Sequence, residues 1–434
     1  MSAPTSVSIR TYQVGFGDCF LLSFVYPDAT ERHVLVDFGT TKLPDDAPKT
    51  RMADIAEDIR TRSGGKLTAV VATHRHQDHI SGFAPDSKGK GTGSVIAELK
   101  PDLVLQPWTE DPDAPVDAIQ PPVHTGDTAK QLGNHARALA AMQIASAQFV
   151  TEARRNNQYL SSIEGKPKEQ IAFIGENNIA NPGAVRNLMG MGKNEYLFSG
   201  QSTALAEALG LEIDVLGPPT VAQHAAVKKQ RPKDPNEFWQ LAATASQAIE
   251  IGEKRRALPL FPGYVRPRAN GNFPIDARWL INRARTVRGS QLLELVRNLD
   301  TAMNNTSLIL LFRSKTKSLL FPGDAQIENW SFSLSQPAVM AKLADVDLYK
   351  VGHHGSLNAT PKTLWAQFKK KSETPASPGR LQTLMSTLEH KHGSVDKYTE
   401  VPRETLVDAL KKNSDLFTTQ SLRGDFWHDT RLEL

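Results

Sequence analysis

The segment Thr73-His74-Arg75-His76-Gln77-Asp78-His79 decides the interpretation of this chain. Three histidines and one aspartate fall within six positions, directly after the apolar run 67–72, which is typical of a strand buried on both faces. In extended backbone alternate side chains point the same way, so His74 and His76 can bind one ion. Asp78 and His79 then turn toward a second ion. Imidazole and carboxylate ligands suit zinc, and also manganese or iron, so the segment predicts a metal centre.

The later half of the chain supplies further ligands of the same kind. The stretch Leu320-Phe-Pro-Gly-Asp324 places a carboxylate at the exit of a buried strand. The stretch Val351-Gly-His353-His354-Gly-Ser356 places two histidines at the exit of another. Alone, each stretch is also consistent with an ordinary polar turn. In the same chain as the first motif, they predict a single site with ligands from both halves.

Short apolar runs divide the chain into a β-rich core in two halves. The runs at 6–12 and 19–26 are separated by Gly15-Phe-Gly17-Asp18, which is hairpin chemistry, and Gly17-Asp18 is also placed to support the metal loop. We expect further strands at 33–37, 67–72, 103–105, 211–217, 307–312, 318–321 and 345–351, and a helix at 47–62. The expected division is a first core half at 1–105, an insertion at 106–302 with one core strand near 210–217, and a second core half at 303–434.

The insertion differs in character from the two core halves. Residues 107–127 are rich in Pro and Asp and predict a loop, whereas 128–162, 236–250 and 275–300 have the spacing of helices. Basic residues gather in its later part: Lys228, Lys229, Arg231, Lys233, Lys254, Arg255, Arg256, Arg266, Arg268, Arg278, Arg283, Arg285 and Arg288. The insertion is therefore expected to be largely helical and basic.

The composition excludes several classes of protein. Of the 434 residues, 39% are apolar and 23% are charged, with a formal net charge of +4, which excludes a disordered or collagen-like chain. The single cysteine, Cys19, allows no internal disulfide and fits a reducing compartment. No apolar run is long enough to span a membrane, and the first residues lack a secretory signal pattern. We expect a cytoplasmic protein with no membrane span.

These motifs resemble the metallo-β-lactamase superfamily, whose signature is the pattern of His74, His76, Asp78 and His79. The resemblance narrows to the metallo-hydrolase domain of the competence DNA-uptake channel protein (ComEC) and its stand-alone relatives. It rests on the stretches QVGFGDCFLL, HVLVDFG, VLGPP, NNTSLILLF, LLFPGD and YKVGHHGS, and it covers the two core halves. It implies an α/β fold, an αββα four-layer sandwich with a large, mostly helical insertion.

The resemblance also implies a ligand set. One or two divalent ions, zinc or else manganese, are expected on His74, His76, Asp78, His79, Asp324 and His354. Asp324 matches the carboxylate that bridges two metals, and Asp37 matches the acidic residue that supports the site from behind. The pattern Val-x-x-His-Gly makes His354 the last ligand, which leaves His353 as a supporting residue or a proton donor.

One departure concerns the first of the two metal positions. Members of the superfamily carry a further His before the strand that leads to the bridging aspartate, where this chain reads Ala302-Met-Asn304-Asn305-Thr-Ser307. Because an amide binds zinc weakly compared with imidazole, the position is weak, is completed by Asn304 or Asn305, or is empty. His124 and His135 of the insertion are alternative ligands, although surface histidines are the simpler interpretation. His390 and His392 either reach the rim of the site and touch a leaving group or belong to a polar loop.

The expected chemistry is metal-dependent hydrolysis. A bound ion with an open position lowers the pKa of water from near 16 to about 7, and Asp78 and Asp324 are placed to orient that water. The likeness to nucleases, the basic clusters, and the aromatic side chains of Phe273 and Trp279 favour a phosphodiesterase acting on DNA or RNA. The alternatives are a hydrolase of small phosphodiesters or esters, and a metal-stabilised binding module whose insertion docks a protein partner.

Overall fold

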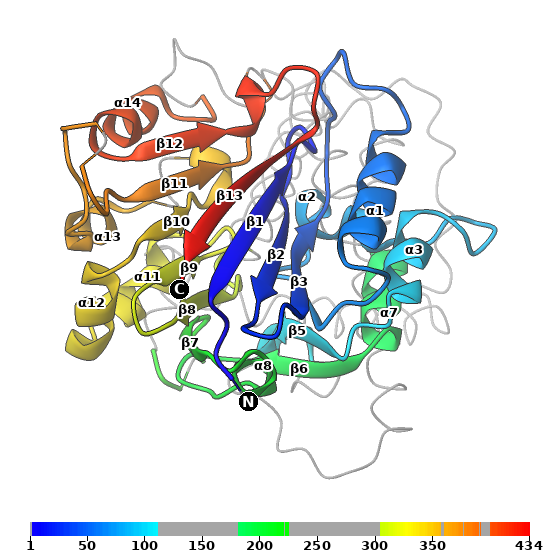
Figure 1. The fold of residues 1–434 in the computed structure, drawn as a ribbon, viewed down its shortest axis with the longest axis horizontal. Coiled ribbons are helices and arrows are strands. Elements are labelled where there is room, and N and C mark those ends of the chain that lie inside the picture. Colours follow the sequence, from blue (N-terminus) through cyan, green and yellow to red (C-terminus); the bar gives the residue numbers. More distant parts are fainter. Residues whose placement is uncertain are drawn as a thin grey trace, which may run out of the picture.

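The computed structural model describes residues 2–111, 181–220, 222–224, 304–356, 360–375, 377–389, 391 and 400–434. Within these ranges the chain is an α/β protein with two mixed β-sheets and helices (Figure 1). The helices expected at 128–162, 236–250 and 275–300 lie outside the described residues, as do the basic clusters between 228 and 288.

The first sheet brings together segments from opposite ends of the chain. Its strand order is β13-β1-β2-β3-β4-β5-β6. Neighbours are antiparallel from β13 to β3 and parallel from β3 to β6. The strands are β1 (Ser6–Tyr12), β2 (Cys19–Val25), β3 (Glu31–Phe38), β4 (Ala69–Val71), β5 (Leu103–Pro107), β6 (Lys193–Leu197) and β13 (Trp427–Glu433).

The second sheet is built mainly from the later half of the chain. Its strand order is β12-β11-β10-β9-β8-β7. Neighbours are parallel from β12 to β9 and antiparallel from β9 to β7. The strands are β7 (Glu212–Gly217), β8 (Ile309–Arg313), β9 (Ser318–Phe321), β10 (Leu348–Lys350), β11 (Gln382–Met385) and β12 (Asp415–Thr418).

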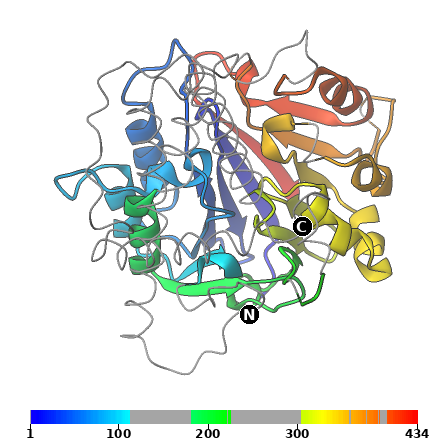
Figure 2. The same ribbon diagram turned by 180° about the vertical axis from the view of Figure 1, so that it is seen from behind.

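Apolar side chains pack between the two sheets and on the outer face of each. Phe20 and Val34 of the first sheet share a core with Leu310 and Phe321 of the second. On its other side the first sheet packs against α1 (Arg51–Arg62), α3 (Thr92–Glu98) and α7 (Pro182–Gly190), as Figure 2 shows from behind. The second sheet packs against α11 (Ile327–Leu334), α12 (Pro337–Ala344), α13 (Lys362–Gln367) and α14 (Glu404–Asn413).

The remaining helices are short. α8 (Ala204–Leu209) closes one end of the core between the sheets. The others are α2 (Gln77–Ile80) and the 3₁₀ turns η1 (Ser81–Phe83), η2 (Trp108–Glu110), η5 (His353–Gly355) and η7 (Thr419–Ser421). No helix among the described residues has the length and apolar character needed to cross a lipid bilayer.

The strands expected from the apolar runs are present, with small shifts at their ends. The hairpin expected around Gly15-Phe-Gly-Asp18 is confirmed by the antiparallel pairing of β1 with β2. The helix expected at 47–62 is α1, which begins later, at Arg51. Pro48 disfavours helical backbone at the residue before it, and its carbonyl accepts from the Arg51 N–H at 3.0 Å in a turn that precedes the helix.

The region expected to be an insertion contributes more to the core than one strand. The expected strand near 210–217 is β7, but β6 and α7 of the same region also pack into the fold. β6 was not anticipated because its sequence, Lys193-Asn-Glu-Tyr-Leu197, is polar. It lies at the edge of the first sheet, where only Leu197 is buried, so it shows no apolar run.

The predicted ligands all follow strands at one end of the molecule. Asp37 lies near the end of β3, and the segment that begins at Thr73 follows β4. Asp324 follows β9, and His354 follows β10. In each case the side chain lies at or beyond the carboxyl end of a parallel strand, which is where α/β proteins commonly place their sites.

A buried histidine predicts a fall in stability at acid pH. Burial lowers the pKa of His33 in β3 to about 4, below its ordinary value of 6.5, so the unfolded chain takes up a proton before the folded protein does. The free energy of unfolding is therefore expected to drop by about 2 kcal/mol between pH 7 and pH 5 through this residue. Urea unfolding at both pH values measures it. In His33→Gln the free energy of unfolding should fall by about 2 kcal/mol less over this pH range. An equal fall in the variant and the native protein would contradict the role given to His33.

Candidate metal centre

Four buried side chains from both sheets converge on one point. Asp78, His79, Asp324 and His354 each offer a ligand atom, and these atoms lie within 4.8 Å of one another. Asp78 and His79 come from α2, which begins directly after the Thr73–His76 loop, and the other two come from loops that follow β9 and β10. The ligands predicted from two distant segments of the sequence thus lie side by side.

The spacing of these atoms suits ligands that share one ion. Two ligand atoms on a tetrahedral zinc lie roughly 3.3 Å apart, given bonds of about 2.0–2.2 Å. Here Nε2 of His79 lies 3.0 Å from Oδ2 of Asp324, and Nε2 of His354 lies 3.6 Å from the same oxygen. The His354 Nε2 also lies 3.1 Å from Oδ2 of Asp78.

Two buried atoms of the group support a metal rather than a closed hydrogen-bond network. Oδ1 of Asp78 and Nε2 of His79 are both buried, and neither makes a hydrogen bond of acceptable geometry within the described residues. The 3.0 Å contact between Nε2 of His79 and Oδ2 of Asp324 pairs a basic atom with a carboxylate, and its length also suits two ligands of one ion. Because buried polar atoms are rarely left unsatisfied, the donor set fits a cation at their centre.

The first two histidines of the motif lie beside this group. The Thr73 hydroxyl donates its hydrogen to Asp37 at 2.7 Å. Its oxygen can then only accept from His74, whose Nδ1–H donates to it at 3.2 Å. The Nε2 of His74 then accepts from Nδ1–H of His76 at 3.0 Å, which leaves a lone pair on Nε2 of His76. Arg75 points elsewhere and pairs with Glu110, with Nε and Oε2 2.7 Å apart. The two histidines expected to share an ion thus contact each other, and neither belongs to the four-residue group.

Asp37 fixes the orientation of His79. Its Oδ2 accepts from Nδ1–H of His79 at 2.8 Å, which leaves Nε2 to face the group. Its Oδ1 accepts from the backbone N–H of Thr73 at 2.7 Å, so one carboxylate holds both the histidine and the loop. Asp37 is buried behind the group, in the place that the resemblance implied.

Two glycines allow the metal loop to lie against the first sheet. A Cβ on Gly17 would lie 2.7 Å from the Asp78 carbonyl oxygen, and one on Gly39 would lie 2.5 Å from the backbone of Asp78. At this approach the N–H of Asp18 donates to the carbonyl of Asp78 at 2.9 Å. The hydrogen bond confirms that the Gly17–Asp18 segment supports the metal loop, as its sequence suggested.

The backbone distinguishes His354 from His353. Both have left-handed φ values, 51° and 44°, which cost about 1–3 kcal/mol each in non-glycine residues and often mark functional sites. This turn buries His354, whose Nδ1–H donates to the carbonyl of Ser386 at 3.1 Å and whose Nε2 faces the group. His353 remains partly exposed, with Nδ1 2.9 Å from the Ser356 hydroxyl and Nε2 4.0 Å from Asp324.

The electrostatics of the group favour positive charge at its centre. Burial alone would raise the pKa of Asp324, but the charges of His79 and His354 hold it well below its ordinary value. Burial would lower the pKa of His79, but Asp324 and Asp37 raise it well above 6.5. Burial and two neighbouring histidines lower the pKa of His74, which keeps it neutral.

Several predicted residues remain apart from the group or outside the described structure. Asn304 and Asn305 are both buried, and the Asn305 amide donates to Glu328 at 3.2 Å. Neither belongs to the four-residue group. His124, His135, His390 and His392 lie outside the described residues.

Two contributors, Lys350 and Ser386, were missed from the sequence, and the Asp18 carboxylate contributes beyond the loop support that its segment suggested. Asp18 lies behind the group, with its carboxylate 3.6 Å from Nδ1 of both His79 and His354. Lys350 is fully buried in β10 and forms an ion pair with Asp18. Ser386 fixes His354 through its carbonyl. Only Lys350 carried a signal, namely a charged residue within an otherwise apolar strand.

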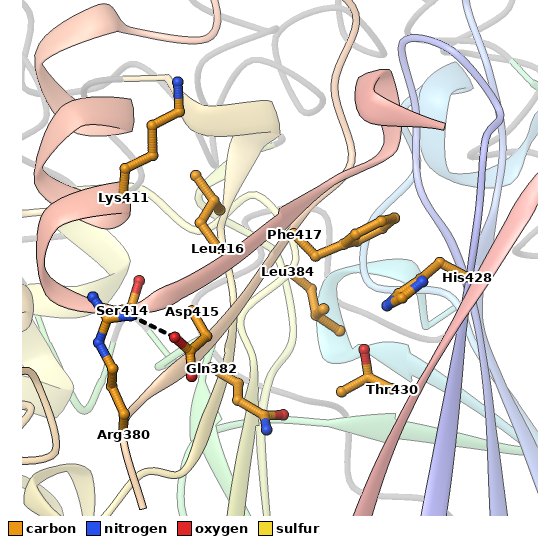
Figure 3. Close-up of a pocket in the computed structure, with 10 residues that line it drawn as sticks. All are labelled: Arg380, Gln382, Leu384, Lys411, Ser414, Asp415, Leu416, Phe417, His428 and Thr430. Atoms are coloured by element: carbon orange, nitrogen blue, oxygen red, sulfur yellow. Dashed lines mark hydrogen bonds and ion pairs between the residues drawn. The ribbon is translucent and has the colours of Figure 1, made fainter. Parts of the chain in front are cut away.

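A surface hollow of about 470 Å³ lies between β11, β12 and β13 (Figure 3). Arg380 pairs with Asp415 on one side, and Phe417 stacks on His428 on the other, with 4.0 Å between ring centroids. The hollow begins at Gln382, the first residue of β11, whereas the metal group lies beyond the carboxyl end of the same strand. It is therefore separate from the candidate metal centre.

Comparison with known proteins adds no name to this site. No family model matches the chain, and no curated protein matches its sequence.

Replacing Asp37 should weaken the centre without removing a ligand. Asp37→Asn keeps the size of the side chain but loses the negative charge behind His79. Residues that orient metal ligands typically contribute 10- to 100-fold in affinity, so we expect zinc to bind about 10- to 100-fold more weakly. Competition with a chromophoric chelator measures the affinity. Asp28→Asn, at an exposed turn, serves as the control, and unchanged zinc affinity in Asp37→Asn would contradict the proposed support.

Proposed function

We propose that this protein is a metal-dependent hydrolase with the αββα four-layer sandwich of the metallo-β-lactamase superfamily, and that it cleaves phosphodiesters. One observation carries the proposal. Asp78, His79, Asp324 and His354 meet in a buried group at the carboxyl ends of strands from two sheets, and two of their ligand atoms make no hydrogen bond within the described residues. The layered cores on and between the sheets support the fold assignment.

The charges around the group also support a metal. Asp18, Asp37, Asp78 and Asp324 are all buried, and Lys350 is the only buried lysine among the described residues. Buried charges are stable only when paired, and these carboxylates raise the pKa values of His79 and His354, so they favour positive charge in the group, which a bound cation would also supply. A divalent ion held by the group supplies a Lewis acid that activates water at neutral pH and neutralises charge that develops on the substrate.

The residues of the chain have separate roles in this proposal. His79 and His354 offer Nε2 because Asp37 and the Ser386 carbonyl hold their Nδ1–H groups. Asp78 offers a second, unsatisfied oxygen that can accept a hydrogen bond from an attacking water and orient it. His353 is partly exposed at the edge of the group, where it can donate a proton to a leaving oxygen.

The attraction between Lys391 and Asp78 supports an anionic substrate. Burial lowers the pKa of Lys391, repulsion from Lys42 lowers it further, and attraction to Asp78 opposes this. Lys391 therefore lies within electrostatic reach of both Lys42 and the metal group. Lysines near a metal attract phosphate, so a phosphodiester is a better match than a neutral ester.

Cleavage assays test the proposal directly. End-labelled single- and double-stranded DNA and the small diester bis(p-nitrophenyl) phosphate are incubated with manganese or zinc, at 50 and 200 mM salt. We expect cleavage that chelation abolishes. Strong inhibition of DNA cleavage by salt would indicate a polyanionic substrate, whereas salt-insensitive turnover of the small diester alone would indicate a small one. A protein that binds metal but cleaves no ester would contradict the hydrolase and favour a binding module.

A further inference from the structure

A buried lysine lies directly behind the metal group. Lys350 is 2% exposed, and its ammonium forms an ion pair with Asp18 and lies 3.5 Å from Oδ1 of Asp324. It also donates to the carbonyl of Gly323 at 3.2 Å. A lysine is almost never fully buried unless it is paired, so this position has a specific reason.

Lys350 serves as the cation of a second acidic group. Asp18, Asp37 and His79 also bring ligand atoms within 4.8 Å of one another, on the side of His79 that faces away from the first group. The ammonium is paired with Asp18 here, and the carboxylates raise the pKa of Lys350 above its ordinary value in spite of its burial. The chain itself thus neutralises the rear of the site.

The two oxygens of Asp324 have different surroundings. Oδ1 accepts from the backbone N–H of His353 at 3.0 Å and faces the Lys350 ammonium. Oδ2 faces Nε2 of His79 at 3.0 Å and Nε2 of His354 at 3.6 Å. One oxygen is therefore held back by the protein, and the other points into the ligand group.

We propose that Lys350 is a positioning residue that holds Asp324 as a one-oxygen ligand, with Oδ1 turned to the ammonium and only Oδ2 offered to the ion. This inference rests on the proposed metal centre. Asp18 anchors the ammonium, so the buried ion pair acts on the metal through the orientation of Asp324. Without the ammonium, Oδ1 is released to rotate toward the group.

The test compares two variants that differ only at residue 350. Asp18→Asn removes one charge but leaves Lys350 beside Asp324, and Asp18→Asn/Lys350→Met then removes the ammonium. The double variant keeps the net charge of the native pair and avoids an unpaired buried carboxylate, so it should fold where Lys350→Met alone does not. Each protein is loaded with cobalt(II), its visible absorption spectrum is recorded, and its affinity is measured by chelator competition.

The cobalt spectrum of Asp18→Asn is the reference for the double variant, because Asp18 itself lies close to His79 and His354. The double variant should show shifted visible bands and cobalt affinity about 10- to 100-fold weaker than Asp18→Asn. Identical spectra and affinities in the two variants would overturn the positioning role of Lys350 while leaving the metal centre standing. A native protein that binds no cobalt, zinc or manganese would instead overturn the proposed function itself, and the two failures are thereby distinguished.

Discussion

Replacing Asp78 and His79 together by alanine is expected to reduce metal-dependent phosphodiester cleavage by at least about a thousandfold. The two residues supply half of the four-residue group, so their loss should remove most of its affinity for an ion. Cleavage of end-labelled DNA and of bis(p-nitrophenyl) phosphate, with metal content measured on the same samples, checks the prediction.

The control for this variant is a histidine far from the group. His428→Ala removes an imidazole of β13 that stacks on Phe417 of β12, and it should leave metal content and cleavage unchanged. Circular dichroism shows whether the double variant keeps its fold, which has to be checked because the loss of His79 leaves the buried carboxylates of Asp37 and Asp324 without this partner. Cleavage that persists in a folded double variant would mean that the activity does not come from this site.

His354→Ala and His353→Ala should separate metal binding from turnover. His354 is buried with Nε2 in the group, so its loss should weaken zinc binding by more than about 100-fold. His353 contacts the group only at its edge, so His353→Ala should keep zinc affinity within a few fold. Its cleavage rate should still fall by about 10²- to 10⁴-fold if it donates the proton to the leaving oxygen.

The loss of cleavage rate in His353→Ala, compared between two substrates, identifies the role of His353. A substrate with a good leaving group, such as p-nitrophenolate, needs no proton donor, so His353→Ala should be least damaged on bis(p-nitrophenyl) phosphate. An equal loss on this diester and on DNA would argue against proton donation. A loss of zinc from His353→Ala together with retention in His354→Ala would reverse the assignment of the pair.

The sequence predicted the core strands because most of them are continuous apolar runs. β2, β8 and β9 are buried along nearly their whole length, and such runs are visible without any alignment. β6 was missed because an edge strand with one buried residue has no such pattern. The local sequence therefore predicts buried strands well and predicts exposed edge strands poorly.

The candidate ligands were predictable because they follow strands, whereas their supports were not. Asp324 and His354 lie just beyond the ends of apolar runs, so the runs indicated the positions of these two ligands. Asp18 and Lys350 meet only through pairing of distant segments, so no spacing reveals them. Which of His353 and His354 faces the group depends on a left-handed turn that the sequence does not predict. A bound metal, hydrolysis and the substrate remain predictions.

The pairing of β1 with β13 has a consequence for synthesis of the protein. Val7 lies opposite Leu432 in this ladder, so the first strand meets its outer partner only when the last residues have been made. At about 5–20 residues per second, a ribosome leaves that edge of β1 unpaired for roughly 20 to 80 s. During this interval the nascent chain presents an open strand edge, which is a template for aggregation. Covering the open edge of β1 until β13 has been made would remove this template from the nascent chain.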